Sequence, residues 1–167
     1  MNTNIAWRFI EGMRRAADAL VIVLFIIMIC GVLIQVCGRY VFNYSIAGTE
    51  EAARFAQVWM VLIGAGVAMR FGRHVAIDVL VTRLPIPIAR VLNVFITLGC
   101  LWFLSLVVMG ALPLLEVGKF ETSPAMEIPM WTMYLSLIIG AVYFGIEVVL
   151  WVVRRWEDPY GKHEVSD

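Results

Sequence analysis

The sequence predicts an all-α integral membrane protein with four transmembrane helices. Hydrophobic residues account for 62% of the 167 residues, and the mean hydropathy of +0.87 is far above the range of soluble domains. Stretches without a charged residue cover residues 19–38, 55–69, 91–115 and 128–146. About 20 helical residues are needed to cross a hydrocarbon core about 30 Å thick. Basic residues gather in alternate connecting segments, which is typical of a polytopic membrane protein.

The four spans are expected at approximately residues 19–38, 50–69, 91–115 and 128–150, within a single membrane domain of residues 1–167. The first is interpreted as a retained helix, because 20 uncharged residues exceed the h-region of a signal peptide and no A-x-A-like cleavage site follows. The second stretch has only 15 uncharged residues, so its helix must extend into the charged residues before it.

The distribution of Lys and Arg predicts that both termini lie in the cytoplasm. Ten of the 13 basic residues lie in the two terminal segments and in the segment between the second and third spans: Arg8, Arg14, Arg15, Arg70, Arg73, Arg83, Arg90, Arg154, Arg155 and Lys162. Only Arg39, Arg54 and Lys119 lie on the other side. The positive-inside rule therefore places the three basic segments on the cytoplasmic face.

A charged cluster opens the second span. Thr49 is expected to cap the helix, with Glu50 and Glu51 in the first turn, where the helix dipole favours negative charge. Arg54 follows Glu50 by four residues and Glu51 by three, so the side chains can meet. Two interpretations stay open: the cluster neutralises itself and reaches the headgroups, or one carboxylate pairs with a partner subunit.

Small residues predict close helix contacts in two spans. Gly64 and Ala68 are four positions apart in the second span, as are Ala141 and Gly145 in the fourth. Trp59 lies well inside the second span and is expected to pack between helices or against lipid.

A short helix is expected on the cytoplasmic membrane surface at approximately residues 74–84, after Arg70. Apolar residues recur there at helical spacing, and prolines end the segment. His74 and Asp78 are four positions apart and are expected to pair with each other rather than to bind a metal, because no further ligands accompany them.

Two other classes of membrane protein are disfavoured by the residues. A membrane-anchor subunit of a redox enzyme would need axial histidines inside the spans, and the spans contain none. A self-sufficient small transporter would need an ionisable residue in the middle of a span, whereas the charges are expected at helix ends. The sequence predicts no catalytic residue, no cofactor and no metal site.

Several fragments in order resemble a known family. The chain contains Gly38-Arg39-Tyr40-Val41-Phe42-Asn43, then Glu50-Glu51-Ala52-Ala53-Arg54, Trp59, Gly64, Arg70-Phe71-Gly72-Arg73-His74, Asp78 and Ile128-Pro129-Met130-Trp131. Together they resemble the small membrane subunit (DctQ type) of tripartite ATP-independent periplasmic (TRAP) transporters over nearly the whole chain. Gly48 is a departure, because the family often has tryptophan there.

The resemblance implies a non-catalytic subunit in the bacterial inner membrane that pairs with the large membrane subunit of a sodium-coupled transporter for organic acids. It would enlarge the scaffold against which the transport domain moves, and a periplasmic substrate-binding protein would contact the complex transiently. Candidate partner-interface residues are Arg39, Glu50, Glu51, Arg54, Trp59, Gly64 and Ala68. Candidates on the cytoplasmic surface helix are Arg70, His74 and Asp78.

Overall fold

The computed structural model describes residues 3–44, 47–71 and 86–157, which form four long helices. These are α1 (Thr3–Tyr40), α2 (Ala47–Arg70), α4 (Ile86–Val117) and α5 (Trp131–Glu157). Each is long and apolar enough to cross a membrane, so the expected all-α class with four spanning helices is confirmed. Thr49 lies inside α2 and does not precede it, so the expected helix cap at that residue is wrong.

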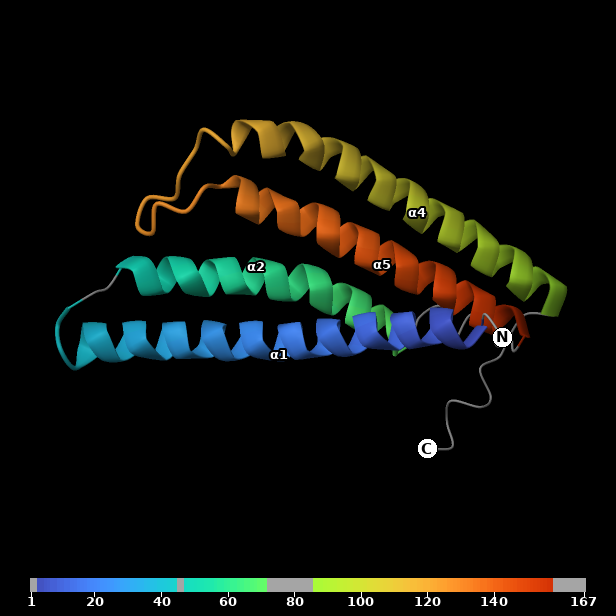
Figure 1. The fold of residues 1–167 in the computed structure, drawn as a ribbon, viewed down its shortest axis with the longest axis horizontal. Helices are drawn as coiled ribbons and strands as arrows, with labels where there is room; N and C mark the ends of the chain where they lie inside the picture. Colours follow the sequence, from blue (N-terminus) through green and yellow to red (C-terminus); the bar gives the residue numbers. More distant parts are fainter. Residues whose placement is uncertain (1–2, 45–46, 72–85, 158–167) are drawn as a thin grey trace.

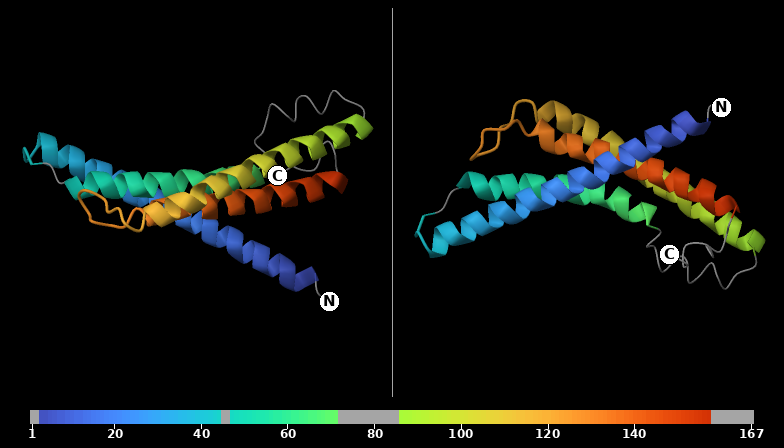
Figure 2. Two further views of the ribbon diagram at one scale, coloured as in Figure 1. Left: turned by 90° about the horizontal axis from the view of Figure 1, so that it is seen from above. Right: turned by 60° about the horizontal axis from the view of Figure 1, so that its bottom comes forward.

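The helices lie side by side in the spatial order α1, α2, α5, α4 (Figure 1). Extensive contacts join α1 to α2, α2 to α5 and α5 to α4. We call the end where α1 begins and α5 ends the termini end; the connection after α1 and the α4–α5 loop lie at the opposite end (Figure 1). Further views show that α1 crosses the other helices at an angle (Figure 2). The layer is therefore open on much of both faces.

A small core forms where α1 crosses α2 and α5. Ala17 of α1, Ile63 of α2 and Tyr143 of α5 are buried together. Partly buried apolar side chains pack around them: Met13, Val21, Trp59 and Val67. Trp59 thus contributes packing within the chain, as its position in the span suggested.

Two glycines allow α2 and α5 to pack closely. A Cβ atom at Gly66 would overlap the ring of Tyr143, and one at Gly140 would lie 2.7 Å from Cβ of Leu62. Neither position has room for a side chain unless its neighbour moves. The contact between the two helices therefore depends on both glycines.

The pairs of small residues expected from the sequence lie in different surroundings. Ala141 is buried, and a Cβ atom at Gly145 would make ordinary contact with Leu101 and Leu104 of α4. Ala68 is exposed, and a Cβ atom at Gly64 would meet nothing within 4 Å. The first pair thus contributes to packing inside the chain, whereas the second is only partly covered by the described helices.

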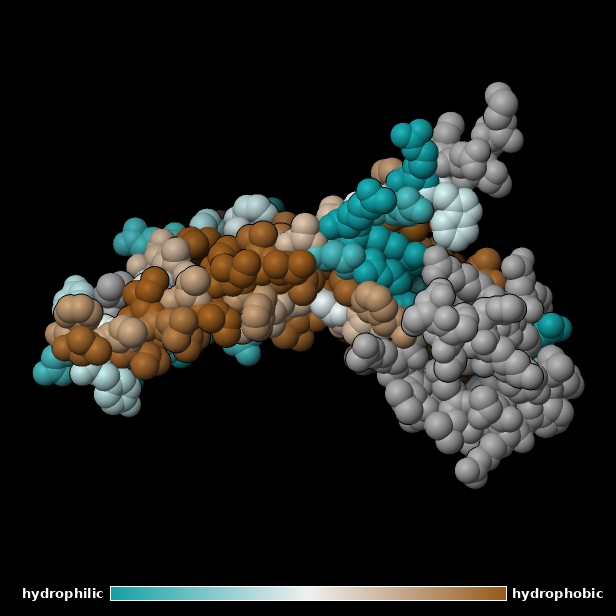
Figure 3. Space-filling model, turned by 90° about the horizontal axis from the view of Figure 1, so that it is seen from below, coloured by the Kyte–Doolittle hydropathy of each residue, from teal (hydrophilic) through white to brown (hydrophobic). Residues whose placement is uncertain are grey.

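Large apolar side chains cover much of the surface. Phe25 is 49% exposed, Phe95 73% and Trp102 69%. Seen from the α1 side, hydrophobic residues form a broad area, and hydrophilic residues gather toward the termini end (Figure 3). A soluble protein rarely exposes so much continuous apolar surface. Together with the four spanning helices, this makes the chain a multi-pass membrane protein.

Candidate functional site

Arg14 of α1 forms a buried ion pair with Glu147 of α5 at the termini end. The Nε of Arg14 donates to Oε1 of Glu147 at 2.8 Å, and a terminal guanidinium nitrogen donates to Oε2 at 2.5 Å. Only 1% of the Glu147 side chain and 12% of the Arg14 side chain are exposed. Both carboxylate oxygens are paired in a bidentate arrangement, so this contact links α1 directly to α5.

A second ion pair joins the next turn of α1 to α2. Arg70, at the end of α2, donates to both carboxylate oxygens of Asp18 at 2.8 and 2.9 Å. Its guanidinium carbon also lies 4.8 Å from the centre of the Phe71 ring. Arg14 and Asp18 are four positions apart on α1, so consecutive turns of this helix bind α5 and α2.

Sequence reasoning missed these interhelical pairs. Glu147 lies inside α5, six positions before the end of the candidate span Trp131–Val153, and it pairs with Arg14, which precedes the uncharged stretch of α1. The sequence feature that could have revealed this ion pair is the single acidic residue between the apolar residues Ile146 and Val148, since an ionisable residue in a span requires a partner. Its partner could not be identified, because 133 positions separate the two residues.

At the opposite end, Glu50 connects α2 to α1. Its carboxylate accepts a hydrogen bond of 2.7 Å from Nε2 of Gln35 and forms an ion pair with Arg54, one turn further along α2. The pairing with Arg54 is the one that the four-residue spacing predicts. The contact with Gln35 was not expected, and it holds the end of α1 against the start of α2.

Glu51 connects α2 to the α4–α5 loop. One carboxylate oxygen accepts hydrogen bonds from the backbone amides of Ala125 at 3.0 Å and Met126 at 2.8 Å. The loop has internal backbone bonds as well, including those from Ser123 to Ile128 and from Met130 to Glu121. The two adjacent carboxylates therefore bind different parts of the chain, one on each side of α2.

Replacing Glu51 by alanine is expected to release the loop from α2. The amides of Ala125 and Met126 would lose a charged acceptor, so their hydrogen exchange should become roughly tenfold faster. Hydrogen exchange followed by mass spectrometry of the loop peptide measures this. Glu121→Ala, which removes an exposed acid of the same loop, is the matched control. Equal exchange in both variants would contradict the role given to Glu51.

The remaining candidate residues lie in several places. Arg39 is exposed in the last turn of α1 and lines a cavity with Glu50. The Arg54 side chain is 72% exposed. His74 and Asp78, together with the expected surface helix at residues 74–84, lie outside the described residues. Within the described part of the chain, no group of three or more His, Cys, Asp or Glu side chains is placed to hold a metal ion.

The geometry defines a polytopic membrane protein whose charged groups hold its own helices together. A sequence model described as the DctQ component of tripartite ATP-independent periplasmic transporters matches residues 28–158. The chain belongs to this family of TRAP transporter small permease subunits, which are not enzymes.

Relatives from three bacteria support this assignment. The chain is 33% identical to the C4-dicarboxylate TRAP transporter small permease protein DctQ of Rhodobacter capsulatus, over 71% of this chain and 55% of that protein. It is 24% identical to the ectoine TRAP transporter small permease protein TeaB of Halomonas elongata, over 78% of this chain and 68% of that protein. It is 27% identical to the isethionate TRAP transporter permease protein DctMQ of Oleidesulfovibrio alaskensis, over 60% of this chain and 16% of that one.

Proposed function

We propose that this chain pairs with the large membrane subunit of a sodium-coupled TRAP transporter and forms part of its immobile scaffold. The observation that carries the proposal is the family match over residues 28–158. The open layer of helices supports it, because broad apolar faces on both sides are available to a second membrane protein. The DctMQ relative is more than six times as long as the region matched, which is consistent with a fused large partner.

The proposed transporter takes up an organic acid across the bacterial inner membrane. The names of two relatives specify C4-dicarboxylate and isethionate, both organic anions. The third relative is named for ectoine, so the small subunit is not expected to select the substrate. A periplasmic substrate-binding protein would deliver the substrate and contact the complex transiently.

The proposed orientation places both termini in the cytoplasm. The termini end of the layer holds Arg8, Arg14, Arg15 and Arg70, and the positive-inside rule assigns such an end to the cytoplasmic face. The opposite end, with Glu51 and the α4–α5 loop, then faces the periplasm. Reporter fusions at the C-terminus and in the loop at residues 118–130 test this assignment.

Purification of the tagged chain from native membranes in mild detergent tests the proposed partnership. Mass spectrometry should identify a large polytopic membrane protein in the stable complex. Recovery of the chain alone, or together with a redox enzyme, would contradict the proposal.

Charge reversal at Arg54 is expected to reduce assembly with the large subunit. An exposed ion pair such as Arg54–Glu50 contributes little to the stability of the chain itself. Arg54→Glu should therefore leave the chain intact, while a contact with the partner would be lost, and co-purification should fall more than tenfold. Arg15→Glu, at an 84% exposed side chain of the termini end, is the control. Full recovery of the Arg54→Glu complex would rule out this contact.

A further inference from the structure

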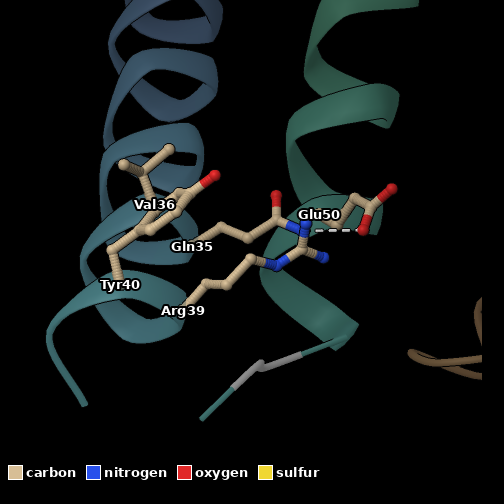
Figure 4. Close-up of a pocket in the computed structure, with 5 residues that line it drawn as sticks. All are labelled: Gln35, Val36, Arg39, Tyr40 and Glu50. Atoms are coloured by element: carbon tan, nitrogen blue, oxygen red, sulfur yellow. Dashed lines mark hydrogen bonds between the residues drawn. The ribbon is translucent and has the colours of Figure 1, made fainter. Parts of the chain in front are cut away.

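A cavity of about 280 Å³ opens between the last turns of α1 and the first turns of α2. Gln35, Val36, Arg39 and Tyr40 of α1 line it together with Glu50 of α2 (Figure 4). Gln35 and Arg39 extend from α1 toward α2, and Gln35 bonds to Glu50. The cavity thus presents a guanidinium and a carboxylate from two helices.

The position of this cavity corresponds to the headgroup level of a bilayer. The uncharged stretch of α1 is 20 residues long, about 30 Å of helix, and is bounded by Asp18 and Arg39. That length matches a hydrocarbon core about 30 Å thick, so Arg39 lies where the core meets the headgroups. A ligand of this cavity would therefore be partly polar and partly apolar.

Arg39 is available to an external anion. Among the described residues it takes part in none of the ion pairs, whereas Arg14, Arg15, Arg54 and Arg70 each do. Its guanidinium presents donors in a planar arrangement that suits a phosphate. Glu50 keeps free lone pairs after its bonds to Gln35 and Arg54, because a carboxylate can accept about four hydrogen bonds.

Apolar side chains continue from the cavity toward the middle of the span. Val36 and the ring of Tyr40 lie beside each other on α1 (Figure 4). Val32, Leu33 and Val36 are 45%, 57% and 47% exposed, so they present a track along which acyl chains can lie. A phospholipid has this combination, with a phosphodiester at the headgroup level and acyl chains that extend toward the middle of the bilayer.

We propose that the cavity binds a phospholipid with a phosphoethanolamine headgroup. Arg39 binds the phosphodiester, and Glu50 accepts a hydrogen bond from the primary ammonium group. A phosphocholine headgroup carries the same charges but has no N–H donor for Glu50. A phosphoglycerol headgroup lacks the cation altogether. The site therefore distinguishes phosphoethanolamine from phosphocholine by a hydrogen bond, and from phosphoglycerol by the charge of the ammonium group.

Native mass spectrometry of the full chain, released from nanodiscs with equal phosphoethanolamine, phosphocholine and phosphoglycerol lipids, tests the proposal. Retained phosphoethanolamine lipid should exceed each of the other two by about two- to fivefold, the range expected for one exposed charged contact. Equal retention of phosphoethanolamine and phosphocholine lipids would overturn the assigned headgroup. Displacement of the lipid by inorganic phosphate alone would identify a free anion as the ligand and would also overturn it.

Two arginine variants provide the matched comparison. Arg39→Gln should lower lipid retention about tenfold, because it removes a charge-assisted contact with the phosphate. Arg15→Gln, at the other end of the same helix, should retain lipid as the unaltered chain does. Both replacements are at exposed positions, so neither should prevent folding. Undiminished retention in the Arg39→Gln variant would show that this cavity is not the site.

Discussion

Glu147→Ala is expected to lower the free energy of unfolding by about 3 kcal/mol, because Arg14 would remain nearly buried without its counterion. For a chain of this length, that loss corresponds to a decrease in the unfolding midpoint of about 6 °C or more. Thermal unfolding of the purified chain in detergent, followed by tryptophan fluorescence, measures it.

Two further variants distinguish the effect of losing the ion pair from the general effect of removing an acidic residue. Glu116→Ala deletes an exposed carboxylate of α4 and should leave the midpoint nearly unchanged. The double exchange Arg14→Glu with Glu147→Arg preserves opposite charges at the two positions and should recover part of the lost stability. A Glu147→Ala midpoint equal to that of Glu116→Ala would contradict the role of the pair.

Gly66→Ala is expected to destabilise the chain by about 1–3 kcal/mol, because the added methyl group would overlap the Tyr143 ring. The ring is buried, so it cannot move aside without disturbing the core around Ala17 and Ile63. The same thermal unfolding measurement detects the change.

Gly64→Ala is a matched control, since it makes the same replacement two positions away on the same helix. A methyl group there meets nothing within 4 Å, so the midpoint should remain close to that of the unaltered chain. Adding Tyr143→Leu to Gly66→Ala removes the overlapping ring. The double variant should therefore lose less stability than the sum of the losses caused by the two single replacements. Equal effects of Gly64→Ala and Gly66→Ala would refute the proposed close contact.

The four helices could be predicted because each depends on a local property of the chain. Uncharged stretches of 15 to 25 residues place apolar side chains on every side of a helix, and only a bilayer accommodates four such helices in so short a chain. The helices are longer than these stretches, since charged residues such as Arg8 and Glu11 continue the helix outside the hydrocarbon.

The contacts between helices could be predicted only in part. Successive helical residues point about 100° apart, so Glu50 and Glu51 could not both face Arg54 in the same way. The residues that they do reach, Gln35 and the amides of the α4–α5 loop, depend on which helices become neighbours. The same holds for Gly66, which the sequence does not distinguish from Gly64 until the position of Tyr143 is known.

Uptake into proteoliposomes distinguishes the proposed scaffold subunit of a TRAP transporter from a protein that transports by itself. The chain, its co-purifying large subunit and the two together would be reconstituted separately, and sodium-driven uptake of organic acids would be followed with the substrate-binding protein present. Uptake only when both membrane subunits are present is the predicted result. Uptake by this chain alone would contradict the account, because the protein would then contain a transport pathway of its own.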